Sequence, residues 1–161
     1  LGDHLGAGAA TELPAAGPVE LRVVPGPHAE RFDKGVLERV AATSFRAGND
    51  SNRVGLRLRA EQVVDWGTAS GELDSQPMAT GAVQLPPGGE PIVLGPDHAT
   101  LGGYPVPVVV IAADHGLLGQ CSPGTAIRLV PVGLEEAEAA FGAQRRMLAG
   151  AVEGHYPLAA G

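Results

Sequence analysis

This chain of 161 residues contains a single cysteine, Cys121, and a single lysine, Lys34. One cysteine excludes a disulfide within the chain and gives no support for a cysteine-rich metal site. No histidine or aspartate pattern next to Cys121 suggests a nucleophile, so we expect an idle or buried thiol. The five histidines are scattered, and we predict no metal. No glycine-rich loop carries a lysine, which excludes a P-loop nucleotide site in this chain.

The chain also lacks an apolar run long enough to span a bilayer, and no basic-then-apolar leader is visible. Its formal net charge of −7 disfavours nucleic acid and anionic membranes as partners. We therefore expect a cytoplasmic protein with one domain. The chain opens on Leu1 rather than methionine, so we expect a piece of a longer subunit or a chain that has lost its earlier part.

Short apolar runs bounded by glycine and proline predict a mainly β fold, a barrel or a sandwich with few helices. Residues 53–59 alternate between aliphatic residues and arginines, as in a half-buried strand. Asp33 is a candidate cap for a short helix. The apolar run 106–112 is the candidate central strand. Further strands are predicted over residues 19–24, 81–85, 91–94 and 126–132, and an extended segment begins at Phe45. A long connection is predicted over residues 59–78 and a tight one over 86–89. Short helical turns are predicted over residues 114–120.

The strongest helix signal covers Leu134 to Gly150. Its acidic first turns and basic last turns suit the helix dipole, and Gly150 is a predicted C-terminal stop. We predict a linker over residues 1–18, the domain over 19–150 and a tail over 151–161. The apolar positions of the helix fall on one stripe, formed by Leu134, Ala137, Phe141 and Leu148.

Residues 97–105 concentrate chemically useful groups between two apolar runs. Asp97 and His98 can act as a proton-transfer pair, or Asp97 can bond the turn backbone while His98 is solvated. Gly102 and Gly103 can form a backbone nest for an anion, or only a tight turn. Tyr104 can supply a phenol or pack against its neighbour.

Two further candidates lie on the predicted strands. Arg53 and Arg57 fall on one strand face, where a guanidinium can bind a carboxylate bidentately or form a surface ion pair. Arg53 is favoured over Arg57 because it adjoins the turn at residues 50–52. Gln84 can read an amide with both a donor and an acceptor, or it can satisfy a neighbouring backbone group.

Several motifs follow one another along the chain: residues 21–28 with 31–32, 50–58, 81–86, 89–94, 97–105, and Gln120 with Pro123 and Gly124. Taken in this order, they resemble the biotin-dependent carboxyltransferase-like family. That family includes allophanate hydrolase subunit 2, the C subunit of 5-oxoprolinase, the carboxyltransferase domain of urea carboxylase and the antagonist of a sporulation-kinase inhibitor. The chain corresponds to about the C-terminal half of such a subunit.

The resemblance implies a cyclophilin-like β-barrel with a few short helices and a C-terminal helix. It also implies a partner, the subunit 1 (KipI-like) protein, and a small amide or lactam substrate. ATP would act at the level of the complex, and biotin could arrive only on another chain. The missing N-terminal half could be a separate chain, and this chain alone would be inactive.

The candidate catalytic residues are therefore Asp97 and Thr100. The family often has two threonines before its Gly-Gly-Tyr-Pro motif, whereas here Leu101 follows Thr100. The expected function is a subunit of an ATP-dependent hydrolase of the 5-oxoprolinase or allophanate hydrolase type. The alternatives are a non-catalytic antagonist of a kinase inhibitor and a component that transfers carboxyl from biotin to urea. Candidate substrate-binding residues are Arg53, Gln84, Gly102, Gly103 and Tyr104.

Overall fold

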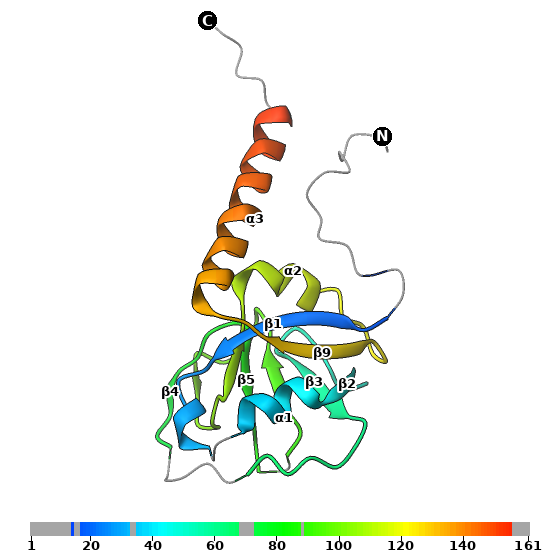
Figure 1. The fold of residues 1–161 in the computed structure, drawn as a ribbon, viewed down its shortest axis with the longest axis vertical. Coiled ribbons are helices and arrows are strands. Elements are labelled where there is room, and N and C mark those ends of the chain that lie inside the picture. Colours follow the sequence, from blue (N-terminus) through cyan, green and yellow to red (C-terminus); the bar gives the residue numbers. More distant parts are fainter. Residues whose placement is uncertain (1–13, 15–16, 33–34, 68–72, 88, 156–161) are drawn as a thin grey trace, which may run out of the picture.

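A computed structural model describes residues 14, 17–32, 35–67, 73–87 and 89–155. Seven strands close into a barrel in the order β1-β8-β5-β6-β3-β2-β9, and β4 pairs with β7 in a separate two-stranded sheet (Figure 1). The predicted mainly β fold with short helices and a C-terminal helix is confirmed. The barrel strands are β1 (Val19–Pro25), β2 (Ser44–Ala47), β3 (Gly55–Ala60), β5 (Ala82–Gln84), β6 (Ile92–Leu94), β8 (Val108–Val110) and β9 (Ala126–Pro131). The other elements are β4 (Gln76–Pro77), β7 (Leu101–Gly102), α1 (Val36–Ala42), α2 (His115–Leu118), α3 (Leu134–His155) and the 3-10 turns η1 (Ala29–Arg31) and η2 (Ala112–Asp114).

The barrel closes where its first and last strands run side by side. β1 and β9 are parallel, with Val19 opposite Ile127, and β9 pairs with β2 on its other side. Both strands alternate, so Leu21 and Leu129 point inward and are buried. Figure 1 shows the two strands lying together across the barrel. Closure leaves these strands no unpaired edge, which removes a site for edge-to-edge association.

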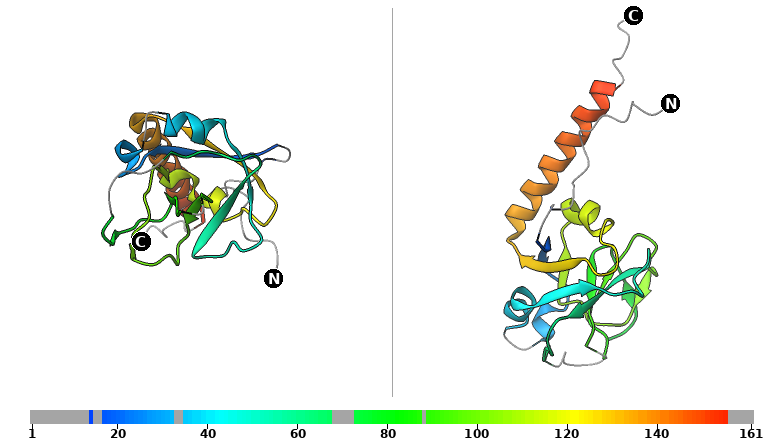
Figure 2. Two further views of the ribbon diagram at one scale, coloured as in Figure 1. Left: turned by 90° about the horizontal axis from the view of Figure 1, so that it is seen from below. Right: turned by 90° about the vertical axis from the view of Figure 1, so that its right-hand side faces the viewer.

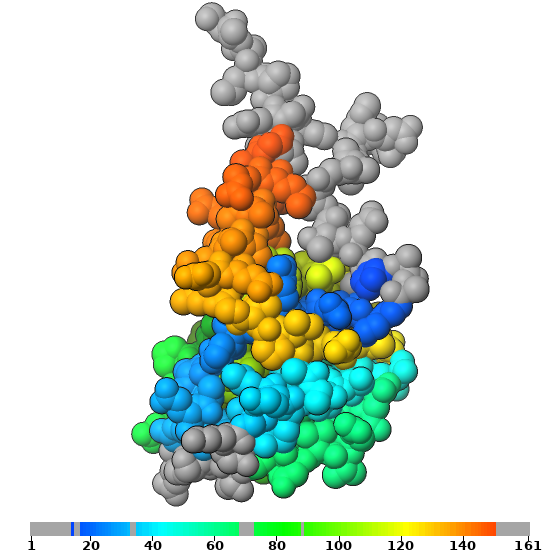
Figure 3. All heavy atoms as spheres, in the orientation of Figure 1, coloured from blue at the N-terminus to red at the C-terminus, as the bar shows by residue number. Residues whose placement is uncertain are grey.

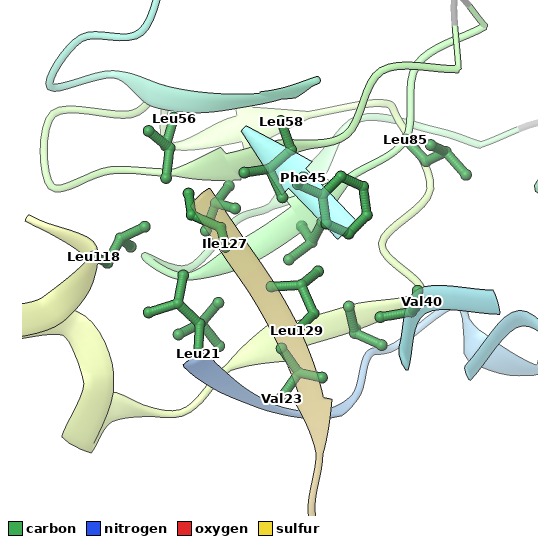
Figure 4. Packing of buried hydrophobic residues seen from close by; sticks show 14 of the residues in the cluster. Leu21, Val23, Val40, Phe45, Leu56, Leu58, Leu85, Leu118, Ile127 and Leu129 are labelled. Atoms are coloured by element: carbon green, nitrogen blue, oxygen red, sulfur yellow. The ribbon is translucent and has the colours of Figure 1, made fainter. Parts of the chain in front are cut away.

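Aliphatic side chains from all seven strands fill the barrel, together with the aromatic rings of Phe32, Phe45 and Trp66. Figure 4 shows Phe45 among the aliphatic residues of this cluster. Phe45 stacks on Trp66 with ring centroids 6.1 Å apart and planes 8° apart. The indole Nε1 of Trp66 donates to the carbonyl oxygen of Gly89 at 2.7 Å. This bond ties the long connection after β3 to the turn between β5 and β6, so the connection predicted over residues 59–78 is anchored to the core.

A buried ion pair joins the start of the barrel to the segment after β8. Asp114 is fully buried and accepts hydrogen bonds from the backbone and the guanidinium of Arg22, the shortest at 2.6 Å. Because a buried carboxylate is stable only when it is paired and hydrogen-bonded, this contact fixes η2 and α2 against β1. The hydrogen bond to Asp114 also raises the pKa of Arg22.

The structure corrects two details of the predicted strands. β3 begins at Gly55, and Val54 lies in the preceding bend with half of its surface exposed. The run over residues 106–112 gives only β8, which pairs with β1 and β5. In a closed barrel every strand has two neighbours, so the prediction of a central strand was wrong. Asp33, the predicted helix cap, lies outside the described residues, and Gly35 occupies the N-cap position of α1.

The C-terminal helix differs more from its prediction. α3 continues through Gly150 to His155, so the predicted stop at Gly150 was wrong. Gly150 does not adopt the left-handed backbone that a C-terminal glycine cap requires. Of the predicted apolar stripe, only Ala137 is buried, in a small cluster with Ile111 and Ala113. Figure 2 shows that α3 stands out from the barrel for much of its length.

Candidate functional site

Three of the segments singled out in the sequence converge on a hollow of about 250 Å³ on the outside of the barrel. Leu56, Val83 and Val93 point into the core, so their strand neighbours point outward. We call this site the outer-face hollow. Its lining residues are Asn52, Val54, Gly55, Arg57, Met78, Gln84, Ile92, Leu94, Ala99 and Leu101.

Strand register places the two main polar groups of the outer-face hollow in one row. Arg57 of β3 lies opposite Ile92 of β6, and Ile92 lies opposite Gln84 of β5. Adjacent strands are about 4.8 Å apart, so Arg57 and Gln84 stand about 10 Å apart on either side of an aliphatic residue. The row offers a cation at one end, an amide at the other and an apolar floor between them.

Gln84 is buried beneath the β4–β7 sheet. Its amide nitrogen approaches the sulfur of Met78 at 3.6 Å, and sulfur is a weak acceptor. A Cβ atom on Gly102 would lie 2.5 Å from that nitrogen, so a larger residue at position 102 would force the Gln84 amide to move. The amide therefore keeps most of its hydrogen-bonding capacity for a molecule in the outer-face hollow.

The β4–β7 sheet is the cover of this hollow. Gln76 pairs with Gly102, and the backbone N–H of Met78 donates to the carbonyl oxygen of Thr100 at 2.9 Å. These contacts place Ala99 and Leu101 on the rim. The side chain of Thr100 is exposed and does not line the hollow, so Thr100 contributes here through its backbone.

The turn before β3 frames the opposite rim. The Oδ1 atom of Asn52 accepts from the backbone N–H of Val54 at 2.8 Å, and Ser51 Oγ accepts from that of Arg57 at 3.0 Å. The guanidinium of Arg57 also pairs with Asp50 at 3.2 Å. This turn therefore fixes both the backbone and the side chain of Arg57.

Arg53 and Asp97 form a separate exposed ion pair. Two hydrogen bonds join the guanidinium to the carboxylate, at 2.6 and 3.1 Å, while the side chains remain 75% and 51% exposed. The hydrogen bond from Arg53 lowers the pKa of Asp97, which makes this carboxylate a weaker proton acceptor. The geometry favours a positioning role for the pair over proton transfer.

Three of the other predicted residues line two further hollows. Arg53 lines one of about 570 Å³ with Thr80 and His115, whereas Gly103 and Tyr104 line one of about 620 Å³ beside Trp66. Gly102 and Gly103 both lack the positive φ that a backbone nest requires. Asp97 and Thr100 line none of these hollows. The structure thus brings Gln84 and Gly102 together, and Arg53 with Asp97, but not the whole predicted set.

Sequence reasoning missed Met78, Asn52 and Ile92 as members of the site. The outward position of Ile92 follows from strand alternation once β6 is recognised, and Asn52 carries a turn signal. Met78 gave no signal, because it enters the site through the pairing of two strands of two residues each.

The remaining reactive side chains do not add a second chemistry. Cys121 donates to the carbonyl oxygen of Leu117, and burial raises the pKa of its thiol to about 11, so the thiol is neutral. Within the described ranges, no cluster of three or more histidine, cysteine, aspartate or glutamate residues could hold a metal ion. No helix of the described part has both the length and the apolar character needed to cross a membrane.

Comparisons with known proteins add to this geometry. The chain is 36% identical over 126 residues to the C subunit of 5-oxoprolinase from Escherichia coli, a match that covers 78% of this chain and 40% of that protein. It is 29% identical over 119 residues to the urea amidolyase of Saccharomyces cerevisiae, covering 68% of this chain and 6% of that protein. The chain therefore spans well under half the length of either relative.

A solved structure supports the fold independently. The crystal structure of the K. lactis urea amidolyase superposes with a TM-score of 0.68 at 22% identity, over 82% of this chain and 8% of that one. Residues 6–131 match the model of the carboxyltransferase domain, subdomain A and B, and this range includes every barrel strand. The chain belongs to that carboxyltransferase domain family.

Proposed function

We propose that this chain is part of the C-type subunit of an ATP-dependent complex that hydrolyses an amide or lactam, of the 5-oxoprolinase or allophanate hydrolase type. The observation that carries the proposal is the Gln84 amide, held at the outer-face hollow with only a weak sulfur contact. The relationship to the C subunit of 5-oxoprolinase supports the same substrate class.

The outer-face hollow suits a small amide that carries an acid group. The Gln84 amide can donate to a substrate carbonyl and accept from a substrate N–H at the same time. Arg57 can pair with a carboxylate at the other end of the row. Ile92 and Leu101 supply apolar contact between them. A volume of about 250 Å³ is below the range of drug-sized pockets, which fits a molecule the size of a single ring.

In this proposal the chain binds and orients the substrate, and other parts of the complex supply the reactive groups. The residues that line the outer-face hollow include no carboxylate, imidazole or thiol. The sequence carries no P-loop lysine, which excludes a Walker-type nucleotide site in this chain. We therefore assign ATP binding, and the contact with the KipI-like subunit 1, to the rest of the complex.

The test is substrate turnover by the chain in its full-length subunit with the subunit 1 partner. Gln84→Leu keeps the side-chain size and removes both hydrogen bonds, so KM for the amide substrate should rise by about tenfold with a smaller change in kcat. Arg57→Leu should raise KM only for substrates that carry a carboxylate. If neither variant changes KM, the outer-face hollow is not the substrate site.

Asp97→Ala and Arg53→Ala test the sequence-based site assignment in the same assay. A loss of kcat with unchanged KM would restore Asp97 as a catalytic residue, whereas unchanged turnover would remove the pair from the mechanism. Supplying 5-oxoproline, allophanate, or urea with carboxybiotin distinguishes the chemistries. Consumption of none of them by the complete complex would contradict the proposed function.

The absence of acid–base groups from the outer-face hollow also favours a second candidate, a non-catalytic protein that antagonises a regulatory partner. Such a protein needs a shaped surface and no reactive residue. Its partner binding would survive Asp97→Ala and Arg53→Ala, and the complete complex would turn over no amide. Pull-down of subunit 1 with both variants separates the two functions.

A further inference from the structure

The C-terminal helix α3 carries a regular row of exposed apolar side chains. Leu134, Phe141 and Leu148 are 67%, 44% and 46% exposed. They are spaced by seven residues, which is about two helical turns or 10.5 Å, so they lie along one side of the helix. Three large apolar groups exposed along one side of a helix make a candidate interaction surface. We call these three residues the α3 stripe.

Two charges of opposite sign flank the α3 stripe. Glu138 and Arg145 follow Leu134 and Phe141 by four residues each, so both lie beside the stripe on the same flank. Both side chains are exposed, and no ion pair joins either to another described residue. The helix is thus acidic toward its start and basic toward its middle along one edge.

The barrel leaves much of this surface exposed, although Glu138 and Phe141 also line an open hollow of about 310 Å³ with Val24, Thr80 and Val109. α3 packs on the barrel through Ala137 and Ala140 in a cluster with Ile111 and Ala113, and Gln144 donates to the carbonyl oxygen of Ala113 at 3.0 Å. Figures 1 and 2 show the helix leaving the barrel beyond this contact, and the space-filling view in Figure 3 shows its later turns standing clear of the strands. The helix also follows the residues 6–131 matched by the family.

We propose that α3 pairs with α3 of a second copy of this chain in an antiparallel arrangement, with Phe141 on the two-fold axis. A residue that precedes Phe141 by seven positions in one copy then faces the residue that follows it by seven in the other. Leu134 of each copy therefore meets Leu148 of the other, which gives two such contacts. Glu138 of one copy lies beside Arg145 of the other, also twice. A single helix face is self-complementary in this orientation, as a two-fold contact requires.

Charge selects this orientation over the parallel one. In a parallel pair the flank that carries Glu138 and Arg145 lies on opposite sides of the seam in the two copies, so these charges would not meet. The antiparallel pair brings the two flanks to the same side and forms two opposite-charge contacts. One helix from each copy makes a small interface, so we expect a dissociation constant on the order of ten micromolar.

Sedimentation velocity on the chain across a range of concentrations tests the pairing. Phe141→Ala should weaken dimerisation by about thirtyfold, as for a central apolar anchor. Glu138→Arg or Arg145→Glu alone should weaken it by about tenfold because each creates two like-charge contacts. The double variant Glu138→Arg with Arg145→Glu should restore the wild-type value. Arg146→Glu is the matched control, since it makes the same charge change on the far side of the helix and should leave dimerisation unchanged.

Disulfide cross-linking in a Cys121→Ser background tests the orientation. Phe141→Cys should cross-link readily, because the two copies of residue 141 meet on the axis. Leu148→Cys should not, because it faces residue 134 of the other copy. Cross-linking of Leu148→Cys would overturn the antiparallel arrangement. If the chain stays monomeric at hundreds of micromolar while circular dichroism shows that α3 is intact, the proposal is overturned. The same holds if α3 binds subunit 1 in place of a second copy.

Discussion

His28 is a buried side chain that ties the turn after β1 to Val106, in the segment before β8. Its Nδ1 atom accepts a hydrogen bond from the backbone N–H of Val106 at 3.0 Å, and its Nε2 atom lies 2.6 Å from the amide of Gln76. An imidazole that accepts at Nδ1 must be neutral there. Burial lowers the pKa of His28, and the charge of Arg31 lowers it further.

This lowered pKa predicts a pH dependence of stability. Between the ordinary histidine pKa of about 6.5 and the lower folded-state pKa, the unfolded chain binds more protons than the folded chain. The contribution of His28 to the free energy of unfolding should therefore be fully present above pH 6.5. It should be lost as the pH falls through the folded-state pKa of His28. Urea denaturation at a series of pH values from 7.5 to about 5 measures the slope. His28→Gln should reduce that slope, and an unchanged slope would assign the effect to other groups.

Gly102 and Gly103 provide a matched pair for the cover of the outer-face hollow. A Cβ atom at Gly102 would lie 2.5 Å from the Gln84 amide and 3.0 Å from Met78, whereas one at Gly103 would have no neighbour nearer than 3.8 Å. Gly102→Ala should displace Gln84, cost about 1–3 kcal/mol of stability and weaken binding of the amide substrate. Gly103→Ala should change neither by more than about 0.5 kcal/mol. Chemical denaturation and substrate titration check both, and equal effects would contradict the close-approach role of Gly102.

At the residue scale, the sequence indicates which side chains carry useful chemistry, but it does not indicate which of them lie together in the folded chain. Gln84 and Gly102 could be named from the sequence because an amide and a glycine each have a restricted chemistry. The sequence favoured Arg53 because it adjoins a turn, but the register places Arg57 in the row with Gln84 and leaves Arg53 paired with Asp97. Register depends on pairing between distant strands, which local pattern does not contain.

Among the elements, the alternating strands and the long helix were recognisable from periodicity, and the β4–β7 sheet was not. Each of its strands has two residues, which is too short for an alternation to be seen. The helix boundary also failed, because Gly150 was read as a stop although glycine is only one of several features that end a helix. The neighbouring helix-forming residues carry α3 past it.

Gly150→Ala tests the corrected end of α3. A Cβ atom there meets nothing within 4 Å, and the backbone is helical, so alanine should favour the helix by about 1 kcal/mol and increase the ellipticity at 222 nm. Gly124 is the matched control, since it also has open space but a φ of +86°. Gly124→Ala should therefore destabilise the protein by about 1–2 kcal/mol. A loss of ellipticity in Gly150→Ala would support a helix stop at that residue after all.

At the scale of the whole molecule, the barrel and α3 are energetically separable. The main core draws its buried residues from the strands, α1, α2, the Trp66 connection and the loop residues Phe32 and Leu85, and none of them from α3. α3 adds only a satellite cluster around Ile111 and one side-chain hydrogen bond to Ala113. The parallel pairing of β1 with β9, which closes the barrel, is complete at Pro131, before α3 begins.

A chain that ends at Gly133 should therefore still fold. Removing α3 exposes part of a small apolar cluster, which should lower the free energy of unfolding by about 2 kcal/mol without loss of a single cooperative transition. Trp66 is the only tryptophan and stacks inside the barrel on Phe45, so its fluorescence during urea unfolding reports the barrel alone. The shortened chain should also be monomeric if α3 forms the dimer contact. A broad transition, or solvent-exposed Trp66 emission before urea is added, would show that the barrel needs its C-terminal helix to close.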